Sequence, residues 1–364
     1  MNLHIVTDSS ISATFYRNLE ALGLSGNNRV VVRSNNAKVK HFPEGVFFGK
    51  LYSPAFRSAV GDTRQYDRVF IHQFSPLMYR WVAMHEFREL NWMVWGTDLY
   101  NLPGTDFNFY EPLTWQRYVS HDFSSAAFLF KLKVWLTNSM FRKKAYAKVD
   151  NVYTWMHSEY QFACDRLPTL RAKHKYFFYV NDVPYHKLDE FLAKAGERSG
   201  NRVSQLLVGN SGTPTNNHFD TVTWLQRNDI KADLFIPAAY GDKHYISFLK
   251  KNLSFYTGGK ITFVDQYMSF GEYVMFLLGT DGLIMNTIRP QGYGNIFMML
   301  YLGLPVFMNE RNISLPDLEK SGIAVNTLQD LKDIGDLDIK PSREAILGIF
   351  SQERMVEIYR LYFS

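Results

Sequence analysis

One segment in the second half of the sequence joins an arginine, two glycines and several amides directly after an apolar run. It reads Met285-Asn286-Thr287-Ile288-Arg289-Pro290-Gln291-Gly292-Tyr293-Gly294-Asn295 and precedes the apolar residues 296–302. Glycines at a helix start leave backbone N–H groups accessible, and the helix dipole favours an anion there. An arginine guanidinium pairs with phosphate through parallel hydrogen bonds. The segment predicts a diphosphate-binding turn, and the alternative is a tight turn with a solvated arginine.

Two further polar turns follow apolar runs in the same half of the chain. Gly209-Asn210-Ser211-Gly212 comes after Leu207-Val208 and could hold a phosphate or a sugar ring. It lacks the spacing of a dinucleotide fingerprint, so an ordinary strand-to-helix turn stays open. Asn309-Glu310-Arg311-Asn312 follows Pro305–Met308, and Asn309 or Glu310 could bind sugar hydroxyls. A charged loop after a buried strand is the equal alternative.

The first half offers a carboxylate among aromatic residues, in Trp95-Gly96-Thr97-Asp98-Leu99-Tyr100. Aromatic walls can raise the pKa of a carboxyl group, which would suit a general base, and they also suit the apolar face of a sugar. A capping aspartate is the alternative for Asp98. His72 ends another apolar run and could line the same cleft, although a hydrogen-bonded structural histidine is the more common arrangement.

Residues 127–148 mix bulky apolar side chains with basic ones, and no acidic residue occurs between positions 126 and 149. This composition is typical of a helix that lies on an anionic membrane surface. A core-packed helix with a basic outer face is the alternative. The predicted membrane contacts are Lys131, Lys133, Arg142, Lys143, Lys144 and Lys148.

The elements that must position these residues alternate along the chain. Short apolar runs, which predict strands, alternate with helical patterns, and this favours parallel sheets covered by helices on both faces. A length of 364 residues suits about two domains. We expect an N-terminal domain over 1–183, a polar linker over 184–203 and a C-terminal domain over 204–340, followed by a helix over 341–364 that packs back on the first domain. Ligands of such sheets bind beyond the carboxyl ends of the strands, where the polar turns lie.

Composition narrows the class of protein. Hydrophobic residues make up 46% and charged residues 21%, which excludes global disorder. The net charge of +5 is compatible with an anionic substrate or membrane and does not by itself indicate nucleic-acid binding. Cys164 is the single cysteine, so an intrachain disulfide is excluded. No HExxH pattern, signal peptide or spanning helix is seen, so we expect a cytoplasmic protein without a metal or other cofactor.

Several of these motifs together resemble one glycosyltransferase family. Val208–Gly212, Trp95–Tyr100, Gln291–Gly294, Gly303-Leu304-Pro305 and Asn309 occur in the order and spacing of the 4-acetamido-4,6-dideoxygalactosyltransferases, glycosyltransferase family 56. The resemblance implies a GT-B fold, in which two Rossmann-like domains with parallel sheets face each other across a cleft. It also implies transfer of an amino-deoxy sugar, similar to Fuc4NAc, from a dTDP-sugar to a saccharide on undecaprenyl diphosphate. This step belongs to bacterial surface polysaccharide synthesis, similar to that of enterobacterial common antigen, at the cytoplasmic side of the inner membrane.

The resemblance also implies roles for individual residues. Arg289 would stabilise the leaving diphosphate without a metal ion, and Asp98 would be the general base. The chain departs from the family at Asn295, where we expect a small hydroxyl residue, and in the order of Glu310 and Arg311. Acceptor contacts are expected from His72, Trp95 and Tyr100. Donor contacts are expected from Asn210, Ser211, Gly212, Tyr240, Arg289, Gln291, Gly292, Gly294, Asn295 and Asn309.

Two other functions remain open on the sequence alone. A nucleotide-sugar epimerase of similar two-domain form would convert its nucleotide sugar without any acceptor. A non-catalytic nucleotide-sugar-binding protein would bind dTDP and transfer nothing. A nucleic-acid binder is a weaker option, since no nucleic-acid motif is present.

Overall fold

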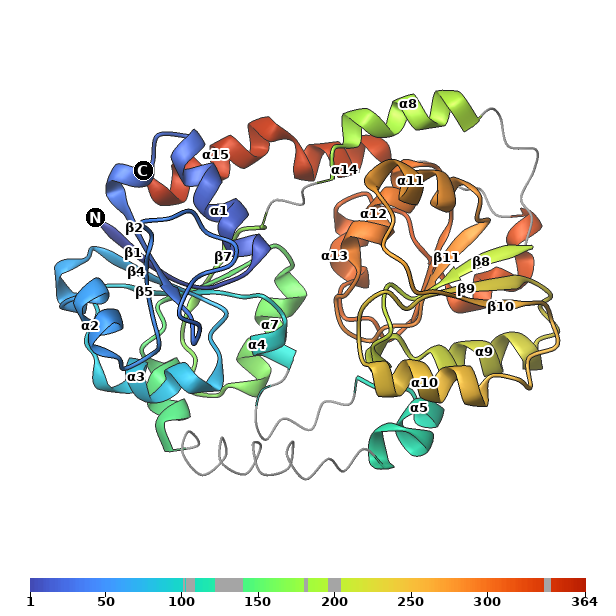
Figure 1. Ribbon diagram of the computed structural model, residues 1–364, viewed down its shortest axis with the longest axis horizontal. Helices are drawn as coiled ribbons and strands as arrows, with labels where there is room; N and C mark the ends of the chain where they lie inside the picture. Colours follow the sequence, from blue (N-terminus) through green and yellow to red (C-terminus); the bar gives the residue numbers. More distant parts are fainter. Residues whose placement is uncertain (101, 103–108, 122–139, 180–182, 196–203, 337–341) are drawn as a thin grey trace. The chain divides into compact units, whose positions relative to one another are not determined.

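The computed structural model describes residues 1–100, 102, 109–121, 140–179, 183–195, 204–336 and 342–364. The chain divides into two compact units (Figure 1). Unit 1 contains residues 1–106, 124–181 and 350–364, and unit 2 contains residues 107–123 and 182–349. The chain therefore enters unit 2 once within its first half, before returning to complete unit 1.

Unit 1 is built on a seven-stranded sheet in the order β3-β2-β1-β4-β5-β6-β7, and all its strands are parallel. Ile5 in the central strand pairs with Val31 on one side and Ile71 on the other, and all three are buried. Helices cover both faces of the sheet, which is why the middle of the central strands is apolar, whereas the edge strand β7 is polar. The strands are β1 (Asn2–Thr7), β2 (Asn28–Arg33), β3 (Phe47–Gly49), β4 (Arg68–His72), β5 (Leu90–Met93), β6 (Asn151–Thr154) and β7 (Lys173–Tyr176). Its helices include α1 (Ser10–Ala21), α2 (Pro54–Val60), α3 (Tyr79–Met84), α4 (Thr97–Tyr100), α7 (His157–Arg166) and α15 (Gln352–Phe363).

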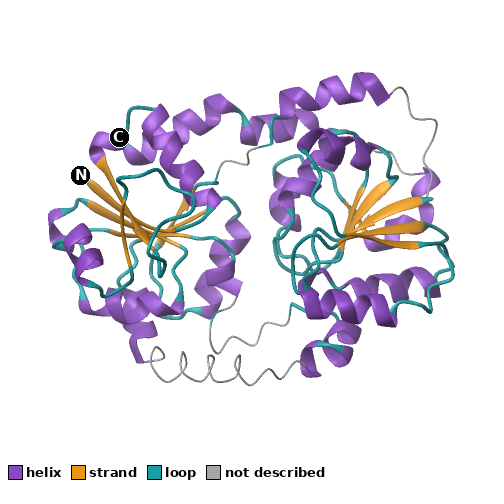
Figure 2. Ribbon diagram, in the orientation of Figure 1, coloured by secondary structure: helices purple, strands orange, loops and turns teal. Residues whose placement is uncertain are grey.

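Unit 2 is built on a six-stranded parallel sheet in the order β10-β9-β8-β11-β12-β13. Figure 2 shows helices on both faces of this sheet as well. The strands are β8 (Gln205–Val208), β9 (Asp233–Pro237), β10 (Ile261–Val264), β11 (Gly282–Met285), β12 (Val306–Met308) and β13 (Asn326–Thr327). The helices are α5 (Pro112–Arg117), α8 (Tyr185–Ala195), α9 (His218–Arg227), α10 (Lys243–Asn252), α11 (Phe270–Leu278), α12 (Tyr293–Tyr301), α13 (Leu315–Lys320) and α14 (Arg343–Phe350). The prediction of two parallel sheets covered by helices is confirmed.

The expected linker and the expected C-terminal helix each contain a helix that packs on one unit. The polar stretch 184–203 contains α8, which packs on α11 and α12 in unit 2. Its Leu188 is buried, and Tyr301 donates a hydrogen bond to Asp189 Oδ2 at 3.1 Å. At the C-terminus, the Phe363 side chain of α15 is buried in the core of unit 1.

Residues 109–121, which we call the α5 arm, extend unit 2 with a segment from the first half of the sequence. Leu113 and Tyr118 pack against the core cluster of unit 2. The Tyr118 ring lies 4.8 Å from that of Tyr245, and its hydroxyl donates to Asp242 Oδ2 at 3.0 Å. The guanidinium of Arg117 lies 5.1 Å from the centre of the Phe219 ring. The arm is therefore attached to unit 2 by apolar, polar and cation–π contacts together.

A chain of buried polar side chains crosses the core of unit 1. Asn28 Nδ2 donates to the carbonyl oxygens of Leu24 and Phe363, so Asn28 Oδ1 must accept from His4 Nε2 at 2.9 Å. The neutral His4 ring then accepts at Nδ1 from His72 Nε2, 3.1 Å away. His72 Nδ1 in turn accepts from the Tyr179 hydroxyl at 2.7 Å. One amide thus fixes the tautomers of both histidines.

The two histidines of this hydrogen-bonded row make the stability of unit 1 depend on pH. Burial lowers the pKa of His4 to about 3 and that of His72 well below its ordinary value of 6.5. Both rings stay neutral in the folded state, whereas the unfolded chain takes up protons below about pH 6.5. The stabilisation is fully present above that pH and is lost as the pH falls below it.

We predict that His72→Gln lowers the free energy of unfolding less at acidic pH than at neutral pH. The wild type loses stability in acid because His72 takes up a proton only on unfolding, and the variant lacks this group. The difference in free energy of unfolding between the wild type and the variant should fall by up to about 1.4 kcal/mol per pH unit below pH 6.5. Urea unfolding followed by tryptophan fluorescence at pH 7.5, 6.0 and 5.0 measures it. A difference that stays constant over this range would show that His72 is protonated in the folded state.

Candidate functional site

The strand order of unit 2 reverses between β8 and β11, which are neighbours at the centre of the sheet. The loops that leave the carboxyl ends of such a pair diverge, and ligands of open α/β sheets bind in the crevice between them. The loop beginning at Gly209 follows β8, and the loop 286–292 follows β11. Two of the turns predicted from the sequence therefore meet at this edge.

The loop after β8 turns sharply at Gly209, which has φ +72°. A Cβ atom there would lie 2.7 Å from His218 Nε2 and 2.9 Å from Asn216 Oδ1, so a glycine is required. Asn216 closes the loop, because its Oδ1 accepts from the Asn210 N–H and its Nδ2 donates to the Ser211 carbonyl at 2.9 Å. The backbone of this turn is therefore fixed by its own side chains.

Three residues that the sequence predicts to contact the nucleotide sugar come from three different loops and are hydrogen bonded to one another. Gln291 Nε2 donates to Asn210 Oδ1 at 2.9 Å, and the Tyr240 hydroxyl donates to the Asn210 carbonyl at 2.9 Å. Thr215 donates to Gln291 Oε1 at 2.7 Å and holds the amide from the other end. Tyr240 follows β9 and is 50% exposed, so its ring is accessible to a ligand. The loops after β8, β9 and β11 thus present these residues at one position.

Helix α12 begins at this same edge. Its N-cap, Gly292, has φ +71°, and a Cβ atom there would lie 2.7 Å from Met285 Cε and 2.9 Å from Asn210 Cβ. Gly294 and Asn295 lie in the first turn and are half-buried. The first N–H groups of a helix have no partner within the helix, and its dipole favours an anion. The closely packed glycine therefore sets the start of α12 against the loop after β8.

Arg289 lies in the loop between β11 and α12 and is half-buried. Asn312 holds this loop, since its Nδ2 contacts the carbonyl oxygens of Thr287 at 2.7 Å and Arg289 at 3.3 Å. The Tyr293 hydroxyl, in the first turn of α12, hydrogen bonds to the Ser314 hydroxyl. The guanidinium thus belongs to a loop whose backbone is fixed on both sides.

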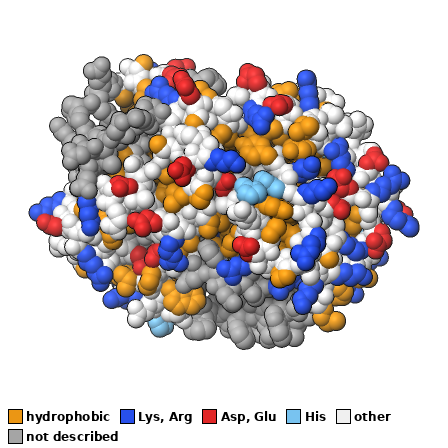
Figure 3. Space-filling view, turned by 180° about the vertical axis from the view of Figure 1, so that it is seen from behind, with side chains coloured by type: hydrophobic (Ala, Val, Ile, Leu, Met, Phe, Trp, Pro, Cys, Tyr) orange, Lys and Arg blue, Asp and Glu red, His pale blue; other side chains and the backbone are white. Residues whose placement is uncertain are grey.

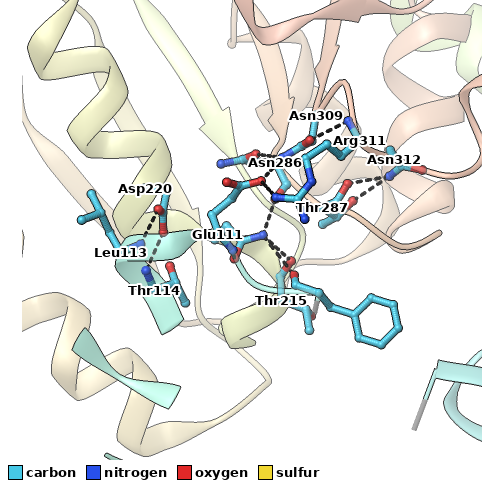
Figure 4. A network of polar contacts seen from close by, with 12 residues as sticks. Glu111, Leu113, Thr114, Thr215, Asp220, Asn286, Thr287, Asn309, Arg311 and Asn312 are labelled. Carbon is cyan, nitrogen blue, oxygen red and sulfur yellow. Dashed lines mark hydrogen bonds and ion pairs between the residues drawn. The ribbon is translucent and has the colours of Figure 1, made fainter. Parts of the chain in front are cut away.

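A second polar group surrounds Asn309 (Figure 4). Asn309 Nδ2 donates to Asn286 Oδ1 at 2.6 Å and to Glu111 Oε1 at 2.8 Å. Arg311 Nη1 lies 3.2 Å from the same Glu111 oxygen. Asn217 joins the two sides, because its Nδ2 donates to the Asn286 carbonyl and its Oδ1 accepts from the Glu111 N–H at 2.9 Å. The α5 arm therefore brings a carboxylate to the ends of β11 and β12.

Asp220 fixes the start of the α5 arm. Its two carboxylate oxygens accept from the N–H groups of Leu113 at 2.8 Å and Thr114 at 2.7 Å, at the N-terminus of α5. Burial raises the pKa of the Asp220 carboxyl, and the hydrogen bonds from Thr114 and Leu113 oppose this. Sequence analysis missed Glu111, Asn217 and Asp220. Glu111 before Pro112 marks a helix start, but no sequence signal places position 111 beside position 309.

Some of the residues predicted to contact the nucleotide sugar have a structural role within unit 2 instead. A Cβ atom at Gly212 would lie 2.4 Å from Ile246 Cγ1, and the residue pairs with Gly241, so it serves close packing. Ser211 is buried, and its hydroxyl hydrogen bonds to that of Thr213. In the described ranges, no three His, Cys, Asp or Glu side chains gather closely enough to hold a metal ion.

Asp98, in unit 1, is almost fully buried at 4% exposure and accepts three hydrogen bonds. The donors are the Phe74 N–H and Trp92 Nε1 at 2.7 Å each and the Trp95 N–H at 3.0 Å. Burial raises the pKa of this carboxyl, and the three donors oppose that rise. These contacts join the turn after β4 to the turn after β5. They give Asp98 a structural role that links segments outside α4, and this differs from the capping role that was the alternative to proton transfer.

The predicted acceptor residues occupy different environments in unit 1. His72 is buried and both of its ring nitrogens are hydrogen bonded, and Tyr100 is buried with its hydroxyl donating to Glu159 Oε1 at 2.9 Å. Neither side chain is accessible to an acceptor in this conformation. Trp95 is half-buried, with its ring edge-to-face against Tyr179 at 5.5 Å.

The basic segment is described from residue 140 onward, so Lys131 and Lys133 lie outside the described residues. Lys143 and Lys144 are exposed, and Arg142 is half-buried. Lys148 is largely buried and forms an ion pair with Glu86 at 2.8 Å, so this lysine is engaged within unit 1. None of the described helices is long and apolar enough to cross a membrane. On the face of the molecule drawn in Figure 3, basic, acidic and hydrophobic side chains are intermixed.

Solved structures share this fold at low sequence identity. Sucrose-phosphate synthase from Thermosynechococcus elongatus is 12% identical with a TM-score of 0.56, covering 100% of this chain and 98% of its own. WaaG, a glycosyltransferase involved in lipopolysaccharide biosynthesis, is 12% identical with a TM-score of 0.50, covering 100% and 95%. HepE from Anabaena, solved with UDP-glucose, is 13% identical with a TM-score of 0.51, covering 99% and 95%. The predicted GT-B fold class is confirmed.

A family model matches the sequence itself. The model describes the 4-alpha-L-fucosyltransferases of glycosyl transferase group 56 and matches residues 113–349. This range covers well over half of the chain, including the α5 arm from Leu113 onward and the loops after β8, β9, β11 and β12. The protein therefore belongs to glycosyltransferase group 56.

Proposed function

We propose that this glycosyltransferase moves an amino-deoxy sugar, similar to Fuc4NAc, from a dTDP-sugar to a hydroxyl of a saccharide carried on undecaprenyl diphosphate. The reaction would serve bacterial surface polysaccharide synthesis, similar to that of enterobacterial common antigen, at the cytoplasmic side of the inner membrane. The family assignment supports sugar transfer, and the resemblance of the donor motifs supports this donor and acceptor. HepE, which shares the fold, was solved with UDP-glucose, and this supports a nucleotide-sugar donor.

The arrangement at the start of α12 is the single observation that carries the proposal. The Gly292 N-cap, the first-turn residues Gly294 and Asn295, and the half-buried Arg289 occur within ten residues after β11. A helix start and a guanidinium together match the charge and shape of a diphosphate. The exposed ring of Tyr240 provides a flat surface for the base of the nucleotide.

The geometry suggests how the chain promotes transfer. The bond between the anomeric carbon and the diphosphate oxygen breaks, and its electron pair stays on the diphosphate. The acceptor oxygen forms the new bond to the anomeric carbon, and its proton passes to solvent water. Arg289 and the N–H groups of α12 stabilise the negative charge that grows on the leaving diphosphate. Because Asn312 and Gln291 already fix the surrounding loops, little reorganisation is needed when the charge develops.

We predict that Arg289→Ala lowers turnover about 100- to 1,000-fold, as expected when one preorganised group at a developing charge is removed. Transfer from a dTDP-sugar to a synthetic polyprenyl-diphosphate saccharide, followed by mass spectrometry, measures this. Lys231→Ala removes an exposed cation of unit 2 and is the matched control. Near-normal turnover of Arg289→Ala would contradict the assignment.

The same assay separates the rival functions. An epimerase would change the nucleotide sugar when no acceptor is added, so the donor is also incubated alone. A non-catalytic binding protein would bind dTDP in calorimetry and transfer nothing to any lipid-linked acceptor. Titration with UDP and GDP beside dTDP tests the base.

For Asp98 we propose positioning of the turns after β4 and β5 in place of the base role expected from the sequence. An asparagine would keep one acceptor oxygen and place an NH2 group against one of the three N–H donors. We predict that Asp98→Asn lowers the free energy of unfolding by about 1–3 kcal/mol. The acidic limb of the pH–rate profile should keep its position. Retained stability combined with a loss above 100-fold and a vanished acidic limb would establish Asp98 as the base.

We further propose that Lys143 and Lys144 contact anionic lipid. They are exposed beside Met140, which is 80% exposed, and this combination suits a membrane surface. Lys148 is left out of this proposal, since it is paired with Glu86.

We predict that the double change Lys143→Ala/Lys144→Ala weakens binding to phosphatidylglycerol-containing vesicles roughly 30-fold, at about 1 kcal/mol for each lysine. Co-sedimentation at 50 and 300 mM salt measures it. Lys38→Ala/Lys40→Ala removes the same charge from two other exposed positions of unit 1 and is the control. Equal losses in both double variants would contradict a specific contact.

A further inference from the structure

A groove of about 440 Å³ lies in unit 2 between the α5 arm, helix α9 and the loop after β12. We call it the α5–α9 groove. Its lining includes Glu111, Asp220, Trp224, Arg227, Asn309 and Arg311. Its volume falls within the range of small-molecule sites. Its lining includes Asn286, at the start of the loop after β11, but none of Arg289, Gly292 and Gly294, so the groove is separate from the residues expected to hold the diphosphate.

The charges around the groove select against an anion. Glu111, Asp220 and Glu310 carry three carboxylates, whereas Arg227 and Arg311 carry two guanidinium groups. A phosphate would meet as much repulsion as attraction here. The same charged groups disfavour a lipid chain. Its methylene groups would displace water from the carboxylates and guanidinium groups without offering them hydrogen bonds. A neutral ligand that both donates and accepts hydrogen bonds suits this lining.

The shapes of the polar side chains suit a sugar in particular. Carboxylate and guanidinium groups are planar and can each contact two neighbouring hydroxyls, and Glu111 and Arg311 offer one of each within hydrogen-bonding distance of one another. The buried amide of Asn309 holds this pair from behind. Pro112, Leu113 and the indole of Trp224 line the groove beside them. These apolar atoms match the C–H face of a pyranose ring.

The polar side of the groove is held in place before any ligand binds. Glu111 is only 18% exposed, and its Oε1 accepts from both Asn309 and Arg311. Its backbone N–H is bound by Asn217, and Asp220 fixes the next turn of the arm. A preformed group of this kind lowers the ordering cost of binding.

We propose that the α5–α9 groove binds one or two sugar rings of the acceptor glycan. The inference rests on the proposed function, because it assumes a saccharide acceptor. The acceptor is chosen over the donor because the donor sugar is attached to the diphosphate, and Arg289, Gly292 and Gly294, the residues expected to hold that diphosphate, do not line the groove. Asn309, which the sequence assigns to the donor, lines the groove and is reassigned to the acceptor side. Glu111 is then a specificity residue supplied by the first half of the sequence.

The test uses the full chain saturated with dTDP and two neutral disaccharide probes, N,N′-diacetylchitobiose and cellobiose. Saturation-transfer NMR reports their binding. Thr223→Trp fills the groove from α9, and Glu111→Gln removes the charge while keeping the shape. Gln116→Ala changes an exposed residue of α5 that does not line the groove and is the matched control.

We expect at least one probe to bind the wild type and the control equally, to lose at least tenfold in affinity in Thr223→Trp, and to weaken several-fold in Glu111→Gln. If Thr223→Trp proves misfolded by circular dichroism, Glu111→Gln decides. Equal binding to the control and to the folded groove variants, displacement of the probe by dTDP, or no binding of either probe overturns the proposal. Calorimetry with dTDP is run separately, so a failed donor site is distinguished from a failed groove.

Discussion

Buried polar groups must be hydrogen bonded, and at the carboxyl edge of the second sheet asparagines meet this requirement. Asn216 closes the loop after β8, Asn217 joins it to the end of β11 and to the α5 arm, and Asn312 holds the loop that carries Arg289. A side-chain amide offers a donor and an acceptor at once, so each asparagine can join two segments that no strand pairing connects. The positions of the functional side chains depend on these amides.

Unit 1 also contains buried polar side chains that join separate segments, but there they stabilise the core. A single amide, Asn28, fixes the proton positions along His4, His72 and Tyr179, and Asp98 gathers three donors from two turns. In both cases the polar groups point to one another, so they stabilise the core and are closed to ligands. In unit 2, by contrast, Tyr240, Arg289 and Glu111 keep part of their surface accessible. This difference explains why the described candidate binding groups concentrate in unit 2.

Sequence reasoning succeeded where the signal is local. The apolar runs at Leu207-Val208 and Gly282–Met285 are strands, and the glycine at position 292 begins a helix at a strand end, as the pattern predicts. It could not give the burial of Asp98, because that burial depends on Phe74, which arrives from the turn after β4, and on the direction of the Trp92 ring in β5. Nor could it give the pairing of Lys148 with Glu86, which are 62 positions apart. Composition marks a segment as basic, but only the fold decides which of its cations remain exposed.

The α5 arm shows most clearly what a local pattern cannot reveal. Its contacts with unit 2 join residues more than a hundred positions apart, from Glu111 to Asn217 and from Leu113 to Asp220. Both ends of the arm continue into sequence that belongs to unit 1. Its side chains nevertheless contact unit 2, where Tyr118 packs on Tyr245 of α10 and Arg117 lies over the Phe219 ring of α9. Undocking the arm would leave the Asp220 carboxylate without its two backbone donors and would expose Leu113 and Tyr118. The arm is therefore a structural part of unit 2, and the carboxylate that it brings to Asn309 is fixed as firmly as the loops around it.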